Sequence, residues 1–227
     1  MAKIPPPKPK ITLPPRLVLV HTRPDLEFLV KSFGLSSRAK FFLTEVFGRD
    51  EIFLCGPVLG APQAAIALEY LKASGVREIL TFGWAGALRE ELPLGSLFLP
   101  EKALSAEGTS SHYGYHPYPS RELFWWLYHE LVAQGLVFEV GTVVSTDALF
   151  REDEDFLARF SAAQVVDMET SALFSVGKAL GISLASLLLL SDHLVPRYER
   201  LKVKDLRKTL AGLLPVFRAF FERKNTL

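Results

Sequence analysis

Two kinds of hydrophobic pattern alternate along the chain. Short, continuous apolar runs are typical of strands buried on both faces, and they occupy residues 16–21, 52–55, 78–82, 96–100, 139–144 and 183–190. Segments with helical spacing or helix-start and helix-stop signals lie between them, at residues 24–33, 64–74, 121–134, 153–160, 169–180 and 204–224. The glycines Gly75 and Gly181 directly follow two of these helical segments, where a helix commonly stops.

This alternation of strands and helices predicts an α/β fold. We expect a single domain over residues 16–227, with a central mixed β-sheet and helices on both of its faces. No linker or internal repeat interrupts this segment. Residues 1–15 are rich in proline and lysine, which predicts a flexible, extended tail ahead of the domain.

Composition and charge exclude several kinds of partner. The chain has 26 Lys and Arg against 25 Asp and Glu, so its net charge of +1 gives no sign of a nucleic-acid or membrane-binding surface. A single cysteine, Cys55, excludes an internal disulfide and fits a reducing cytoplasm. We see no apolar signal core near the N-terminus, and the longest apolar stretch, residues 182–190, is too short to span a bilayer. We therefore expect a cytoplasmic protein with a small-molecule partner.

Candidate chemistry lies where the predicted strands end, since open α/β sheets collect ligands there. Residues 83–86 (GWAG) predict a tight turn, for which a plain structural role is favoured. Glu169 begins a helix, where capping is favoured over ligand binding. A carboxylate such as Asp192, at the exit of a buried strand, needs partners or a task, and a cap and an acid are equally good interpretations. His112 and His116 lie in a loop without acidic or cysteine partners, so no metal site is predicted.

Taken in order, these segments resemble the nucleoside phosphorylase family, which includes purine nucleoside phosphorylases, uridine phosphorylases and related nucleosidases. The resemblance extends over residues 17–220. Several unrelated matches in the right order are much more specific than any one of them. The landmarks are residues 56–62 (GPVLGAP), 83–88 (GWAGAL), 107–113 (EGTSSHY), 145–150 (STDALF), 166–169 (VDME) and 191–193 (SDH).

The resemblance implies a role for individual residues. Met168 and Glu169 match the ribose-binding pair of the family. Asp192 matches the acid that protonates or hydrogen-bonds the departing base in the purine-cleaving members. Four residues would lie against the base: Ala85, Gly86, Leu149 and Phe150.

The phosphate-binding part departs from the family pattern. The family has a Gly-Asp-Pro loop followed by an arginine after its first strand, whereas residues 21–25 read HTRPD. Thr81 stands where the family has another arginine, and Trp84 stands where it has a hydroxyl residue. Each charge-assisted contact to phosphate contributes roughly 1.5–3 kcal/mol, so phosphate binding would require Arg23 or Arg38 to compensate. Trp84 would also fill part of the phosphate space.

Three functions stay open at this point. Phosphorolysis of a nucleoside is favoured, with inorganic phosphate as co-substrate and no other cofactor. Hydrolysis is the first alternative, with Asp25 or Glu27 as candidate bases for water, and nucleoside binding without catalysis is the second. A purine is favoured because the glutamine–arginine pair with which uridine phosphorylases read uracil is not evident after Phe150. The family also implies a homo-oligomer (dimer, trimer or hexamer), with Trp125 and the aromatic loop 113–118 as candidate contacts.

Overall fold

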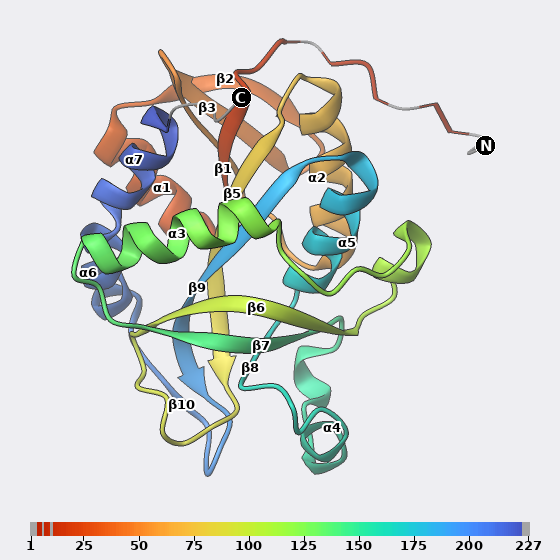
Figure 1. The fold of residues 1–227 in the computed structure, drawn as a ribbon, viewed down its shortest axis with the longest axis vertical. Coiled ribbons are helices and arrows are strands. Elements are labelled where there is room, and N and C mark those ends of the chain that lie inside the picture. Colours follow the sequence, from red (N-terminus) through yellow and green to blue (C-terminus); the bar gives the residue numbers. More distant parts are fainter. Residues whose placement is uncertain (1–3, 6, 10, 224–227) are drawn as a thin grey trace.

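The computed structural model describes residues 4–5, 7–9 and 11–223. Within this part of the chain the strands form a ten-stranded mixed sheet in the order β10-β9-β6-β7-β8-β5-β1-β4-β3-β2 (Figure 1). The strands are β1 (Arg16–Val20), β2 (Ser36–Phe41), β3 (Thr44–Arg49), β4 (Ile52–Gly56), β5 (Glu78–Ala87), β6 (Leu97–Ala106), β7 (Phe138–Thr146), β8 (Val165–Asp167), β9 (Ser183–His193) and β10 (Glu199–Arg200). The helices are α1 (Arg23–Phe33), α2 (Ala61–Ala73), α3 (Arg121–Ala133), α4 (Glu154–Arg159), α5 (Thr170–Leu180), α6 (Val203–Gly212) and α7 (Leu214–Glu222), with short 3₁₀ turns η1 (Ser110–Tyr113) and η2 (Leu149–Arg151).

The sheet curls so that part of it closes on itself. Strand β5 pairs with β8 on one side and with β9 on the other, while β6 and β7 complete the path from β9 back to β8. Strands β1, β4, β3 and β2 continue from β5 as an open sheet. The closure brings the ends of β5, β8 and β9 together, and these ends carry several of the predicted site residues.

Helices cover both faces of the open part of the sheet (Figure 1). Alternate residues of β1 point to opposite faces: Leu17 and Leu19 pack in the core beneath α2 and α5. Val18 and Val20 pack in the core shared by α1, α3, α6 and α7. A strand covered on both sides has no solvent face, which explains its continuous apolar run.

Helix α1, expected at residues 24–33, begins and ends at residues that suit helix termini. Thr22 is its N-cap and accepts a hydrogen bond from the backbone N–H of Asp25 at 3.3 Å. Pro24 lies in the first turn, where its missing N–H costs nothing. Gly34 ends the helix with a φ of 63°, a conformation that favours glycine.

The predicted turn at residues 83–86 is wrong, because β5 continues through it to Ala87, with a register shift against β9 between Ala85 and Gly86. Its edges are paired there by strands from distant parts of the chain: β9 pairs as far as Ala87, and β8 pairs with Gly86. The two glycines serve close packing instead. A Cβ added to Gly83 would lie 2.1 Å from Nδ1 of His21, and one added to Gly86 would lie 2.5 Å from Leu194.

Two further predictions need correction. The closing helix expected at 204–224 is broken into α6 and α7 at Leu213, with Pro215 in the first turn of α7; residue 224 lies outside the described residues. The β2–β3 hairpin was not predicted, because β2 has mostly exposed, polar residues without an apolar alternation.

The segment ahead of β1 is partly described. Leu13 is buried, and its N–H donates to the carbonyl of Ser74 at 2.8 Å. Residues 1–3, 6 and 10 lie outside the described residues, so the flexible tail over residues 1–15 stays a prediction. Among the described helices, none is both long enough and apolar enough to cross a membrane.

Candidate active site

Glu169 lies at the junction of β8 and α5 with its carboxylate almost fully buried. Its exposed fraction is 4%. One carboxylate oxygen, Oε1, accepts a hydrogen bond from the backbone N–H of Gly60 at 2.6 Å. The other, Oε2, lies 3.3 Å from Nδ1 of His21, which is itself 5% exposed. Met168, next to Glu169, is half-buried. The carboxylate is thus fixed from two sides beside a methionine, as the predicted ribose-binding pair requires.

Asp167 supplies the side-chain acceptor for the first N–H of helix α5, whose N-cap residue is Glu169. Its Oδ2 accepts from the backbone N–H of Thr170 at 3.0 Å, and its Oδ1 accepts from Ser145 Oγ at 2.5 Å. Burial, reinforced by the neighbouring charge of Glu169, raises the pKa of Asp167 to about 6 against the opposing effect of its hydroxyl donors. Glu169 occupies the N-cap position of α5, as its place at the helix start predicts, but its carboxylate makes no capping hydrogen bond and makes its contacts elsewhere.

The same network ties three landmark segments together. The backbone N–H of Ser171 donates to Ser145 Oγ at 2.9 Å, and Ser171 Oγ donates to Glu107 Oε1 at 2.9 Å. The N–H of Gly108 donates to Asp147 Oδ2 at 2.9 Å. The segments 107–113, 145–150 and 166–169 therefore meet around the start of α5.

Asp192 lies near the end of the strand pairing between β9 and β5, one residue before the last pair. It is in register with Gly86, which in turn is in register with Val166 on the other side of β5. A Cβ added to Gly86 would lie 3.2 Å from Asp192 Oδ2, and Ser191 Oγ donates a short hydrogen bond to Asp192 Oδ1. Two of the predicted base-binding residues, Ala85 and Gly86, therefore lie on β5. This strand runs between β9, which carries Asp192, and β8, which leads to Glu169.

Leu149 and Phe150, the other predicted base-binding residues, lie on η2 and face solvent. Their exposed fractions are 50% and 94%. The strand that precedes them, β7, pairs with β8 up to Ser145 opposite Asp167, so η2 follows the sheet beside the candidate site. Whether these two side chains contact a base stays a prediction.

Glu152, immediately after η2, was not among the predicted site residues. Burial and the nearby charge of Asp192 raise its pKa to about 7. Glu152 is therefore close enough to Asp192 for the two charges to interact. The acidic run at residues 152–155 was a possible signal in the sequence. It had served only to show that the glutamine–arginine pair of uridine phosphorylases is not evident there.

Replacing Glu152 with glutamine is expected to stabilise the protein increasingly as the pH rises from about 4.5 through about 7. The folded chain holds the Glu152 proton more tightly than the unfolded chain, so the stability of the wild type falls over this window. Glutamine does not titrate, so the variant does not lose stability through this group as the pH rises. Thermal midpoints of both proteins across the window test this, with the exposed Glu154→Gln as control. A gain that shrinks with rising pH would contradict it.

The ring of His21 packs directly on Gly83. Gly83→Ala is expected to destabilise the fold by about 1–3 kcal/mol, because the new methyl group must displace a buried ring. In a His21→Ala background the same change should cost little. Chemical denaturation of the two single variants and the double variant measures this coupling. Equal destabilisation in both backgrounds would show that the His21 ring is not the reason why position 83 needs a glycine.

The region where phosphate was expected contains buried polar groups. Asp25 is fully buried and accepts from Thr22 Oγ1 at 2.7 Å. The Trp84 indole lies beside its carboxyl group, although Trp84 Nε1 and Asp25 Oδ1 do not meet in a direct hydrogen bond. Burial raises the pKa of Asp25, opposed by Thr22, Trp84, the charge of Arg207 and that of His21. Thr81 is also buried, and its hydroxyl donates to Ser186 Oγ at 2.7 Å.

The two arginines considered for phosphate lie elsewhere. The Arg23 side chain is 69% exposed and lies 4.0 Å from Glu27, which is 66% exposed. Arg38 is exposed on β2, and its Nε donates to the carbonyl of Gly48 at 2.9 Å. Neither is brought to His21 or Asp25 by any contact of the described residues. Nor do those residues place three or more His, Cys, Asp or Glu side chains where they could hold a metal ion.

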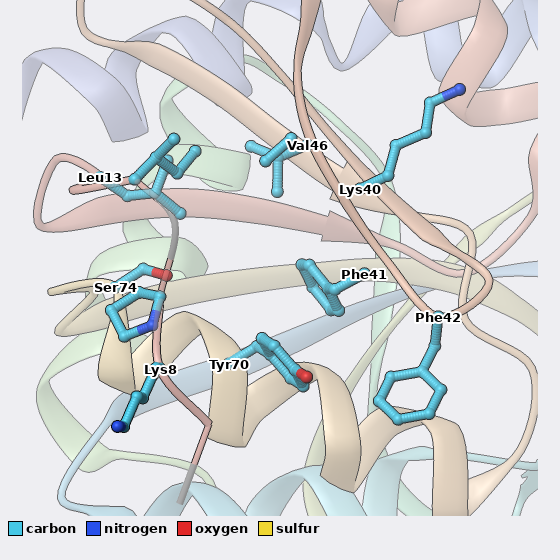
Figure 2. A pocket seen from close by; sticks show the side chains of 11 residues that line it. Lys8, Leu13, Lys40, Phe41, Phe42, Val46, Tyr70 and Ser74 are labelled. Carbon is cyan, nitrogen blue, oxygen red and sulfur yellow. The ribbon is translucent and has the colours of Figure 1, made fainter.

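Two surface cavities lie away from the candidate ribose- and base-binding residues. One, of about 360 Å³, is bounded by the segment before β1, the β2–β3 hairpin and α2 (Figure 2). Its wall includes Phe41 stacked on Tyr70, with ring centroids 4.7 Å apart. The other, of about 340 Å³, is bounded by α1, the hairpin and Pro57, and Arg23 lines it. None of Glu169, Asp192, Ala85 or Gly86 lines either cavity.

Comparison with known proteins places this chain in a family. The family described as the phosphorylase superfamily matches residues 13–215. The chain belongs to the phosphorylase superfamily. Among curated members, it is 28% identical over 151 residues to a guanosine phosphorylase of Halorubrum lacusprofundi, covering 64% of this chain and 62% of that relative. The matched region thus spans about three-fifths of the length of that protein.

Solved structures of the superfamily share the fold. A uridine phosphorylase of Vibrio fischeri matches with a TM-score of 0.76 at 29% identity, covering 92% of this chain and 90% of the other. An AMP nucleosidase of Bacteroides thetaiotaomicron matches with a TM-score of 0.75 at 24% identity, covering 93% and 91%. The predicted family and the predicted mixed α/β fold are confirmed.

The structure of this phosphorylase-superfamily chain adds residues that the sequence did not single out. His21 and Gly60 both contact Glu169, and Glu152 lies near Asp192. His21 had been noted only as a replacement for a family glycine. A histidine directly after a buried strand is itself a signal, since its ring must be accommodated at the carboxyl edge of the sheet. The catalytic and binding roles of the predicted residues stay predictions.

Proposed function

We propose that this chain cleaves the N-glycosidic bond of a purine nucleoside. The observation that carries the proposal is the placement of two carboxylates on either side of the same end of β5. Glu169 follows β8 and Asp192 ends β9, and both strands pair with β5 at Gly86. Membership of the phosphorylase superfamily and the likeness to a guanosine phosphorylase support the same reaction.

The chemistry assigns a task to each carboxylate. Cleavage passes through a sugar with oxocarbenium character, so the base must leave with its bonding electrons and the ribose must be held in place. Glu169 would accept hydrogen bonds from ribose hydroxyls while Met168 packs against the sugar. Asp192 would donate a proton or a hydrogen bond to the departing purine.

Phosphate is the acceptor that the name of the guanosine phosphorylase supports. Hydrolysis is the second candidate, favoured by a specific observation: a buried carboxylate, Asp25, lies where the resemblance places the phosphate loop. The proposed steps need no cofactor other than the acceptor. Binding without turnover is the remaining alternative.

The deciding experiment is product analysis on inosine, adenosine, guanosine and uridine, with and without phosphate. Cleavage of the purine nucleosides is the expected result. Turnover of uridine alone would overturn the purine assignment. Tight nucleoside binding without a product in either buffer would leave only the binding alternative. Ribose 1-phosphate and free ribose distinguish the two acceptors.

The chain is also proposed to act as a homo-oligomer in the cytoplasm. Its single cysteine supports the compartment. Exposed apolar residues support self-association: Phe42 and Leu43 at the tip of the β2–β3 hairpin are 75% and 79% exposed, and Tyr118 and Trp125 are 51% and 47% exposed. Size-exclusion chromatography with light scattering measures the assembly, and a monomer at micromolar concentration would contradict it.

A further inference from the structure

The loop between β4 and α2, residues 57–60, supplies the backbone N–H that contacts Glu169. Gly60 is the N-cap of α2, and its N–H donates to Glu169 Oε1 at 2.6 Å. We infer that Gln63, in the first turn of α2, is a positioning residue that holds this loop so that the Glu169 carboxylate is oriented for the ribose hydroxyls. The inference rests on the proposed function and adds a determinant of its selectivity for the sugar.

The side-chain amide of Gln63 bonds to two residues of this loop and to the neighbouring hairpin. Its Oε1 accepts from the backbone N–H of Leu59 at 3.0 Å, and its Nε2 donates to the carbonyl of Pro57 at 3.0 Å. Nε2 also donates to Thr44 Oγ1 at 3.1 Å. A glutamine amide has one acceptor oxygen and two N–H donors, and all of them are used here. The amide therefore fixes the loop directly before Gly60.

Thr44, the first residue of β3, sets the direction of the Gln63 amide. It is 2% exposed. Its hydroxyl donates to the Pro57 carbonyl at 3.1 Å, so its oxygen presents a lone pair to Gln63 Nε2. Two acceptors, Thr44 Oγ1 and the Pro57 carbonyl, thus face the amide nitrogen, while the N–H of Leu59 faces the amide oxygen. A flipped amide would lose all three hydrogen bonds.

The position of Gln63 also explains why the Gly60 N–H is available to Glu169. A glutamine at the third residue of a helix commonly reaches back to the N–H of the N-cap residue. Gln63 is the third residue of α2, yet it binds the N–H of Leu59, one residue earlier. The N–H of the N-cap, Gly60, is thereby left for Glu169. A carboxylate next to a helix N-terminus is also favoured by the helix dipole.

The Gly60 contact determines how the Glu169 carboxylate can meet a sugar. An ionised carboxylate has about four acceptor positions, two on each oxygen. Gly60 occupies one on Oε1, and His21 lies near Oε2, so each oxygen keeps a position for a ribose hydroxyl. Releasing the loop would leave the charge of Glu169 in place and disturb its orientation. The loss should therefore fall on the hydrogen bonds to the hydroxyls and spare the contacts to the base.

The test compares wild type with Gln63→Met, which keeps the length of the side chain and removes its hydrogen bonds. Gln134→Met is the matched control, because Gln134 is exposed at the end of α3. The substrates are inosine and 2′,3′-dideoxyinosine, which lacks the hydroxyls that Glu169 would bind. We expect Gln63→Met to lower kcat/KM for inosine about 10-fold or more, as the loss of one hydrogen bond to a charged group does. Its kcat/KM for dideoxyinosine should stay close to that of wild type, and the control should match wild type on both substrates.

Two variants of Thr44 and one measurement without turnover complete the test. Thr44→Ser keeps the hydroxyl and should retain more activity on inosine than Thr44→Val, and this difference should vanish on dideoxyinosine. Amide hydrogen exchange, measured by NMR, reports the Gly60 N–H directly. Exchange at Gly60 should be faster in Gln63→Met than in wild type and in the control. Thermal midpoints of all variants show that the folded protein is compared.

The outcomes separate this inference from the proposed function. Equal losses on both nucleosides, or unchanged exchange at Gly60 in Gln63→Met, would overturn the role of Gln63 while leaving nucleoside cleavage intact. A wild type that binds inosine without cleaving it would overturn the proposed cleavage alone. Calorimetry then makes the same comparison through the affinities for the two nucleosides, and equal weakening of both would contradict the inference. A wild type that binds neither nucleoside would overturn both.

Discussion

Replacing Glu169 with glutamine is expected to lower kcat/KM for nucleoside cleavage about 1,000-fold. Each hydrogen bond from a ribose hydroxyl to an ionised carboxylate contributes roughly 1.5–3 kcal/mol, so two of them correspond to about 100- to 10,000-fold. The carboxylate also faces His21 at 3.3 Å, and a neutral amide orients that ring less well. The expected loss therefore includes both substrate binding and the chemical step.

Steady-state kinetics on the best purine nucleoside measures this loss. Glutamine keeps an oxygen that can accept from Gly60, so the fold should survive, and a thermal midpoint close to that of wild type confirms it. Glu101→Gln, at an exposed position on β6, is the control for a generic loss of charge. A Glu169→Gln enzyme with wild-type kinetics would show that the ribose is held by other groups.

Asp192→Asn is expected to slow the cleavage of ordinary purine nucleosides by about 100- to 1,000-fold, the contribution typical of a general acid. Asparagine keeps the shape of the side chain and an oxygen that can accept from Ser191, but it cannot transfer a proton. A purine base is a poor leaving group as an anion, so the loss falls on the bond-breaking step. The variant should therefore lose kcat more than it raises KM.

The leaving group itself provides the control for Asp192. A 7-methylated purine nucleoside carries a positive charge on the base, so its base departs without a proton from the protein. The Asp192→Asn variant should cleave this substrate nearly as fast as wild type does. An equal loss on both substrates would mean that Asp192 positions the base or supports the strand ends, and does not act as the acid.

The sequence determined the layered architecture because burial on two faces has a direct signature. Continuous apolar runs such as that of β1 are shielded from water only when helices cover both faces of the sheet, as they do here. The end of α5 at Gly181 was also readable, since such a stop signal acts within one turn of the chain. The order of the landmark segments was enough to indicate the family.

Tertiary structure alone decided where strands continue and which carboxylate faces the site. Residues 83–86 have the local features of a turn, yet pairing with β8 and β9, formed by residues far along the chain, extends β5 through them. Asp167 and Glu169 are two residues apart and chemically alike. Only the positions of Ser145, Gly60 and His21 direct one to the first N–H of a helix and the other toward the candidate ribose site. Local sequence sets propensities, whereas such long-range contacts exist only once the sheet has closed.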